Sequence, residues 1–140
     1  MFFMAIEEVK FDLDIGKGEG GHDDERRLIR EVFNDYGNGF HFVARQMKIF
    51  EPHRDTDAGG HFHPYDELYY LAMGQAEFYL EDIDTKEGRT FEMIPGSRLL
   101  IPSNVAHKVP LITEDAFLIG CTAEPWISDK VSAHKYEFSR

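Results

Sequence analysis

Three histidines and one glutamate are the residues of this sequence best suited to chemistry: His61, His63, Glu67 and His107. Two histidines one residue apart lie on the same face of a β-strand, because side chains alternate between faces and each residue advances the strand by about 3.3 Å. Both imidazoles can therefore reach one cation. Neutral imidazole and carboxylate are ligands of divalent Fe, Mn, Zn, Ni and Co, whereas calcium and magnesium sites are built mainly of oxygen. The four residues predict a transition-metal site.

The spacing around these residues forms two strings. From His61 the chain reads H-x-H-x3-E-x6-G, which ends at Gly74, and from Pro95 it reads P-G-x5-P-x-N-x2-H, which ends at His107. These strings resemble the two motifs of the cupin superfamily, of which the first supplies two histidines and a glutamate and the second one histidine. The resemblance implies an all-β fold, the cupin double-stranded β-helix or jelly-roll barrel, with these four residues as metal ligands.

Two positions depart from the cupin pattern without removing a ligand. Asp55 stands where a glycine usually lies six residues before the first histidine, and Asn104 stands where the second motif often has glycine. Asparagine tolerates the left-handed backbone conformation better than most residues, so Asn104 can replace a glycine in a turn. The remaining histidines have no comparable pattern, and we expect solvated or hydrogen-bonded side chains at His22, His41, His53 and His134.

Composition limits the classes of function. A chain of 140 residues with 42% hydrophobic content has the size of one domain with a single core. Its 15 Lys and Arg against 26 Asp and Glu give a formal net charge of −11, with no basic cluster to bind a phosphate backbone or an anionic membrane. We therefore expect a small-molecule substrate, with neither nucleic acid nor a membrane as partner.

Cys121 is the single cysteine, so no disulfide forms within the chain. Burial as an inert thiol is the expected state of this residue. The opening residues lack the pattern of a secretory signal, and nowhere do 18 apolar residues run together. We expect a cytoplasmic protein.

Short apolar runs separated by Pro, Gly, Asn and Asp indicate many strands, as in a sandwich or barrel. The predicted strands are residues 40–50, 61–63, 67–73, 76–80, 89–93, 98–101, 107–111 and 116–122. Before them, alternation over residues 9–15 predicts another strand, whereas residues 24–36 fit either a helix or a strand. We divide the chain into an N-terminal extension, residues 1–39, which packs on a cupin barrel, residues 40–140.

Strand alternation also predicts which side chains line the pocket. On the strand of Glu67, the residues Tyr69, Leu71 and Met73 share its inward face, and Tyr70 points the opposite way. The same parity places Val109 and Leu111 inside, on the strand of His107. Tyr69 is the candidate catalytic hydroxyl next to Glu67, although an inward tyrosine is also a common core residue.

Three classes of function fit this site. The sequence from Gly60 to Tyr70 resembles sugar-isomerase-type cupins, which implies a metal-dependent isomerase or epimerase acting on a sugar or similar oxygenated substrate. By this resemblance a carboxylate, Glu67 or another, moves the proton. An iron-dependent dioxygenase would use the same ligands. The third class is a non-catalytic cupin that binds a small molecule or a metal. Four protein ligands leave about two octahedral positions open, which favours chemistry over a closed structural site.

The first forty residues have more apolar alternation than a free tail needs. Strand edges of small barrels must be covered, so we expect this segment to pack against a barrel edge of its own or of a neighbouring subunit. We therefore expect a homodimer.

Overall fold

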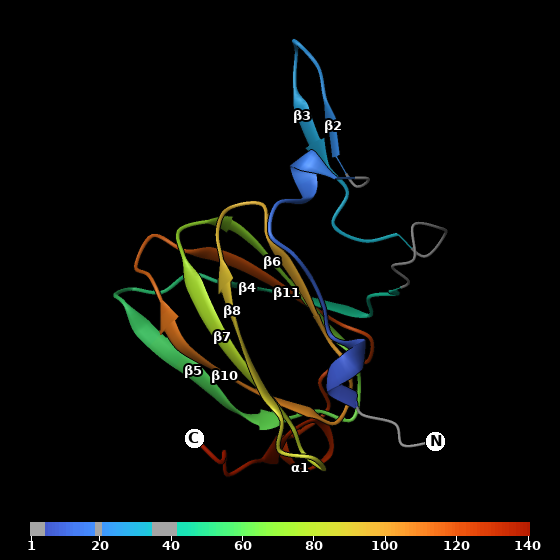
Figure 1. Cartoon of the computed structure of the whole chain (residues 1–140), viewed down its shortest axis with the longest axis vertical. Coiled ribbons are helices and arrows are strands. Elements are labelled where there is room, and N and C mark those ends of the chain that lie inside the picture. The colour runs from blue at the N-terminus through green and yellow to red at the C-terminus, as the bar shows by residue number, and fades with distance from the viewer. Residues whose placement is uncertain (1–4, 19–20, 35–41) are drawn as a thin grey trace.

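The computed structural model describes residues 5–18, 21–34 and 42–140 (Figure 1). Two five-stranded antiparallel sheets face each other and enclose the core, which confirms the predicted all-β jelly-roll fold. The first sheet has the order β1-β9-β6-β11-β4, and the second has the order β12-β5-β10-β7-β8. Residues distant in sequence are therefore neighbours in each sheet.

The strands of the first sheet are β1 (Lys10–Asp12), β4 (Gln46–Phe50), β6 (Glu67–Met73), β9 (Arg98–Ile101) and β11 (Phe117–Thr122). Those of the second are β5 (Thr56–Phe62), β7 (Ala76–Asp82), β8 (Gly88–Met93), β10 (Val105–Ile112) and β12 (His134–Lys135). A separate hairpin contains β2 (Gly21–Asp23) and β3 (Leu28–Arg30), and the helical turns are η1 (Ala5–Glu8), η2 (Ile15–Lys17) and α1 (Asp129–Ser132).

Apolar side chains fill the space between the sheets. Phe78, Leu80, Leu99 and Leu118 are buried there, and Ile6 from η1 closes one side of the same cluster. Burial of these side chains removes apolar surface from water, at about 25 cal/mol per Å². The core therefore holds the two sheets at a fixed separation around the site.

A smaller apolar cluster lies on the outer face of the first sheet. Leu68, Leu100 and Cys121 meet Phe42 there, and partly buried side chains such as Phe33 pack against them. Cys121 is a buried free thiol, as expected, and burial raises the pKa of this thiol.

Most predicted strands are present, and β6 and β9 have the predicted bounds. The inward faces of Met73 and Leu111 were predicted wrongly, since these side chains are 56% and 38% exposed. Each lies at a register shift. Met73 lies opposite Phe117, next to the shift between Phe117 and Leu118, and Leu111 lies within the shift between Val109 and Ile112. A bulge reverses the alternation of side chains beyond it, and for this reason Ile112 is buried in place of Leu111.

The ambiguous segment at residues 24–36 contains strand β3, which forms an antiparallel hairpin with β2. Figure 1 shows this hairpin extending beyond the end of the barrel. The strand expected at residues 9–15 is shortened to β1, which pairs with β9 at the edge of the first sheet. The division at residue 39 stays a prediction, since residues 35–41 lie outside the described part of the chain.

The turns agree with the two motifs. Asn104 has a φ of 68°, the left-handed conformation expected for a residue in the place of a glycine. Gly74 has a φ of 79°, and a Cβ there would lie 2.6 Å from the Cα of Ala116. The turn at Asn104 leads into β10, and the turn at Gly74 leads into β7. Both strands contribute side chains to the interior of the barrel. Within the described ranges, the helical segments are all too short or too polar to cross a bilayer.

The expected homodimer stays a prediction, and the outer side of β4 is the surface on which to test it. β4 is the last strand of its sheet order, so it forms an edge of the sheet. Met47 and Ile49 on β4 are 63% and 47% exposed, and Val43 before β4 is 55% exposed. If a second copy covers this surface, Ile49→Glu would bury a charge and weaken assembly by about tenfold or more. Sedimentation velocity would show a dimer of the 16.2 kDa chain at micromolar concentration.

Val131→Glu is the matched control, because Val131 is 52% exposed on α1 and is not part of β4. A compact monomer for the unchanged protein at this concentration would contradict the dimer.

Candidate functional site

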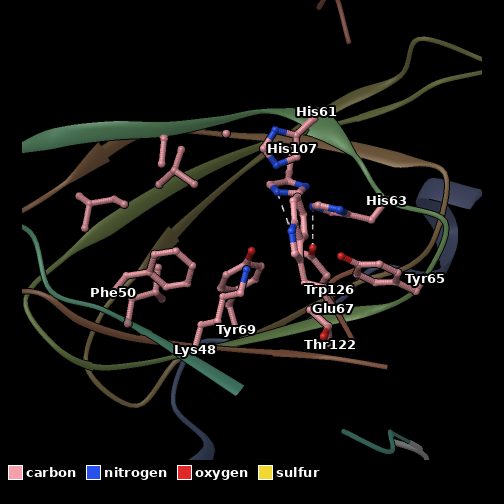
Figure 2. Close-up of a pocket in the computed structure, with 16 residues that line it drawn as sticks. Lys48, Phe50, His61, His63, Tyr65, Glu67, Tyr69, His107, Thr122 and Trp126 are labelled. Atoms are coloured by element: carbon pink, nitrogen blue, oxygen red, sulfur yellow. Dashed lines mark ion pairs between the residues drawn. The ribbon is translucent and has the colours of Figure 1, made fainter. Parts of the chain in front are cut away.

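The barrel contains a cavity of about 320 Å³ between its two sheets (Figure 2). Polar groups gather at one part of its wall, and apolar side chains form the rest. The polar lining residues are Lys48, His61, His63, Tyr65, Glu67, Tyr69, His107 and Thr122, and the larger apolar ones are Phe50, Val109, Ile112, Leu118 and Trp126. A concave apolar pocket with a few convergent polar groups is the usual form of a small-molecule site.

The three predicted histidines meet at one point of this wall. His61 lies on β5, His63 directly follows that strand, and His107 on β10 is the partner of His61 in the β5–β10 register. One ring nitrogen of each lies within 4.8 Å of the others. Figure 2 shows the three rings turned toward one another. The structure therefore brings together residues that the two motifs place far apart in sequence.

Glu67 reaches the histidines from the opposite sheet, as the first residue of β6. Its Oε1 lies 2.7 Å from Nε2 of His63, and its Oε2 lies 3.8 Å from Nε2 of His107. The residue is 3% exposed. Burial by itself raises the pKa of Glu67, but the attraction of His107 and the hydrogen bond from His63 outweigh burial and lower it. Glu67 is therefore a carboxylate at neutral pH.

The ring of His63 has acceptors at both nitrogens. Its Nδ1 lies 2.5 Å from the carbonyl oxygen of Ser132, and its Nε2 faces Glu67. Burial by itself lowers the pKa of His63, yet the hydrogen bond and charge of Glu67 raise it overall. The contact with Ser132 directs the Nδ1 proton away from the cavity, which leaves Nε2 as the nitrogen that meets the other site residues.

Two buried polar atoms of the cluster lack a hydrogen-bond partner among the described residues: Oε2 of Glu67 and Nδ1 of His107. Burial lowers the pKa of His107 to about 4, so this ring is neutral at pH 7. A neutral imidazole and an unpaired carboxylate oxygen can each donate an electron pair. The chemistry of this donor set suits a divalent transition metal.

Tyr69 lines the cavity two residues after Glu67 on β6, as predicted. Burial and then the negative charge of Glu67 hold its pKa well above the ordinary value, so its hydroxyl remains protonated. The ring packs 5.0 Å from that of Phe78, and Gly120 leaves room for it, since a Cβ there would lie 2.9 Å from the Tyr69 ring. Tyr70 points to the outer face of the sheet.

Sequence reasoning missed five polar or aromatic residues of the wall: Lys48, Phe50, Tyr65, Thr122 and Trp126. Tyr65 stacks on His63 at 5.0 Å, and burial raises its pKa to about 12. The alternation of residues 47–50 could have predicted that Lys48 and Phe50 share the inner face of their strand. Nothing in the sequence around Trp126 indicated that its loop returns to the barrel.

The other histidines do not line the cavity where the structure describes them. His22 lies on the β2–β3 hairpin, and its side chain is 64% exposed. His53 and His134 are exposed as well. His41 lies outside the described residues.

The C-terminal segment supports the site from outside the barrel. β12 pairs with β5 beside His61, and α1 ends at Ser132, whose carbonyl meets His63. The buried carboxylate of Glu81 holds the end of this segment, because it accepts hydrogen bonds from the hydroxyls of Tyr136 and Ser139. The orientation of His63 thus depends on a segment about seventy residues later in the chain.

No family model matches this chain, and no curated protein matches it in sequence. Its fold is similar to that of a sugar 3,4-ketoisomerase mutant from Thermoanaerobacterium thermosaccharolyticum in complex with TDP-4-keto-6-deoxyglucose, with a TM-score of 0.69, 15% identity, and 90% of this chain and 86% of that chain covered. It is also similar to dTDP-4-dehydrorhamnose 3,5-epimerase from Bacillus anthracis, with a TM-score of 0.70, 16% identity, and 82% and 73% covered.

A third similar structure is a 3'-monoepimerase from Streptomyces bikiniensis in complex with dTDP-quinovose, with a TM-score of 0.72, 15% identity, and 91% and 68% covered. These proteins have the cupin fold, which agrees with the resemblance of the two motifs. At such low identity the likeness concerns the fold.

Replacing Glu81 tests the role of the C-terminal segment. Burial by itself raises the pKa of Glu81, but hydrogen bonds from Ser139, Tyr136 and Tyr79 lower it overall. A lowered folded-state pKa contributes stability above the unfolded-state pKa, and this contribution is lost as the pH falls through the folded-state pKa. Glu81→Gln should therefore cost about 1–3 kcal/mol of unfolding free energy at pH 7, and the cost should shrink below pH 4.5.

Denaturant unfolding at several pH values measures this cost, and amide hydrogen exchange at Tyr136 shows whether the segment loosens. Glu137→Gln, at an exposed position of the same segment, is the control. A cost that is the same at all pH values would contradict the assigned role of the carboxylate.

Proposed function

We propose that this protein is a metal-dependent isomerase or epimerase that acts on a sugar or a similar oxygenated small molecule. The observation that carries the proposal is the convergence of three imidazoles and a buried carboxylate in one cavity. The fold is shared with sugar ketoisomerases and epimerases, which supports the choice of reaction class. One barrel fold hosts many chemistries, so the site itself must carry the argument.

The proposed metal ligands are His61, His63, Glu67 and His107. Three nitrogen donors within 4.8 Å of one another, with a carboxylate beside two of them, fit a divalent Fe, Mn, Zn, Ni or Co ion. The Oε2 of Glu67 supports this assignment, because a buried polar atom without a hydrogen bond costs free energy that an ion would recover. A bound ion would polarise a substrate carbonyl and stabilise negative charge on its oxygen.

Glu67 and Tyr69 are the proposed catalytic residues. Isomerisation moves a proton between neighbouring carbons and another between their oxygens, so the site needs a base and an acid. Glu67 is ionised at neutral pH, and its Oε2 has no hydrogen-bond partner among the described residues. Tyr69 remains protonated beside it, and its hydroxyl can donate a hydrogen bond or a proton to a substrate oxygen.

The apolar part of the wall strengthens the electrostatic interactions of Glu67 and Tyr69 with a substrate. Phe50, Val109, Ile112 and Leu118 line the cavity beside the polar cluster. An apolar wall excludes water and lowers the local dielectric constant, which strengthens every charge interaction inside. A charged intermediate would therefore be held by fixed groups of the protein in place of mobile water.

Hydrogen exchange in deuterated water tests the reaction class. The metal-loaded protein should incorporate deuterium next to the carbonyl of an aldose, a ketose or a keto sugar and convert it to an isomer, as followed by proton NMR. Treatment with a chelator should abolish both events, and the same metal should restore them. Full activity after chelation would contradict the proposed metal dependence. Oxygen uptake with bound iron would identify a dioxygenase in place of an isomerase.

Metal content tests the four ligands one at a time. Replacing His61, His63, Glu67 or His107 by Ala removes one of four donors, so bound metal should fall about tenfold or more at equal free metal. Elemental analysis and competition with a chelator measure this loss. His22→Ala is the control, since His22 lies on the hairpin. A His107→Ala protein that retained its full metal content would contradict the assignment of the second motif.

Paired tyrosine variants test the proposed acid. Tyr69→Phe removes the hydroxyl and keeps the ring, so folding and metal content should persist while turnover falls by a factor of about 100 or more. Tyr70→Phe changes the neighbouring residue on the outer face and should leave turnover nearly unchanged. Steady-state kinetics on both variants measures the difference. Equal effects would contradict the role given to Tyr69.

A further inference from the structure

Lys48 brings a positive charge to the wall of the cavity across from the histidines (Figure 2). It lies on β4 opposite Gly120 of β11, on the inner side of the first sheet with Phe50. Among the described residues that line the cavity, it is the one Lys or Arg. The one lining carboxylate, Glu67, is already engaged by two histidines.

The ammonium group of Lys48 is positioned by an aromatic ring. It lies 4.7 Å from the ring centroid of Trp126, and the same ring lies 6.3 Å from that of His63. The loop of Trp126 is attached to β4, because the backbone N–H of Trp126 donates to the side-chain oxygen of Gln46. Trp126 thus connects Lys48 to the histidine cluster in one continuous wall.

Lys48 has no counter-ion in the described part of the chain, where no carboxylate oxygen lies within 4 Å of its ammonium group. The chain as a whole has a net charge of −11, which repels anions. An unpaired cation at a cavity of an acidic protein is therefore a local exception that favours a negatively charged ligand.

We propose that Lys48, positioned by the ring of Trp126, binds an anionic group of the substrate, a phosphate or a carboxylate, while the uncharged part of the substrate extends to His61, His63 and His107. The substrate is then an anionic sugar derivative. This inference uses the proposed function for the reacting end only, since the binding of the anion does not depend on turnover. Lys48 is exposed to solvent, so the anion keeps part of its hydration and avoids the cost of full burial.

Trp126 is the single tryptophan of the chain, so its fluorescence reports binding at this wall without any reaction. Glucose, glucose 6-phosphate, gluconate and thymidine 5'-diphosphate are titrated into the metal-loaded protein. Glucose 6-phosphate or gluconate should bind about tenfold or more tightly than glucose, and affinity should fall as salt is raised. Tighter binding of thymidine diphosphate would support the same site with a nucleotide as the source of the phosphate.

Lys48→Met should lower the affinity for the anionic ligands by about tenfold or more and leave that for glucose nearly unchanged, whereas Lys48→Arg should retain most of the anion affinity. Lys17→Met, at an exposed position on η2, is the matched control. Equal affinities for glucose and its phosphate, or an anion preference that survives in Lys48→Met, would overturn the inference.

The two proposals fail separately. Lys48-dependent anion binding without isomerisation would contradict the proposed function and support the anion site. Isomerisation of glucose 6-phosphate with the same kinetics in Lys48→Met as in the unchanged protein would support the proposed function and overturn the anion site.

Discussion

The burial of one carboxylate among three imidazoles is the constraint on which the rest of the site depends. Glu67 is 3% exposed and ionised, and an isolated charge in that position would be strongly destabilising. It is tolerated because His63 and His107 lie against it. Their positions depend in turn on the β5–β10 register, which places His61 opposite His107, and on the core that holds β6 against the second sheet.

Packing contacts and hydrogen bonds from other elements hold this cluster in place. Tyr69 and Gly120 form one wall, and the carbonyl of Ser132 orients His63 from the other side. Glu81 anchors the C-terminal segment that carries Ser132. A reactive site needs such support, because a catalytic group displaced by about 1 Å loses much of its effect. The proposed isomerase therefore depends on residues that never meet a substrate.

Local patterns predicted much of the fold. The alternation from Glu67 to Tyr70 placed the side chains on the correct faces, because a regular strand repeats every two residues. The same rule failed at Met73 and Leu111, where bulges add a residue to one strand of a pair. A bulge depends on the partner strand, so a single segment carries little sign of it. The segment at residues 24–36 stayed ambiguous for a related reason, since hairpin pairing decides between helix and strand.

The two motifs by themselves predicted which residues could bind a metal and that His61 and His63 lie side by side, because residue type and spacing set both expectations. The structure brings these residues together at one wall of the cavity. The tertiary structure decided which residues complete the site. Lys48, Trp126 and Ser132 come from an edge strand, a loop and a helical turn, and only the folding of distant segments onto one barrel brings them to His63. Contacts of this kind follow from sheet order and strand register, which join residues that no local pattern connects.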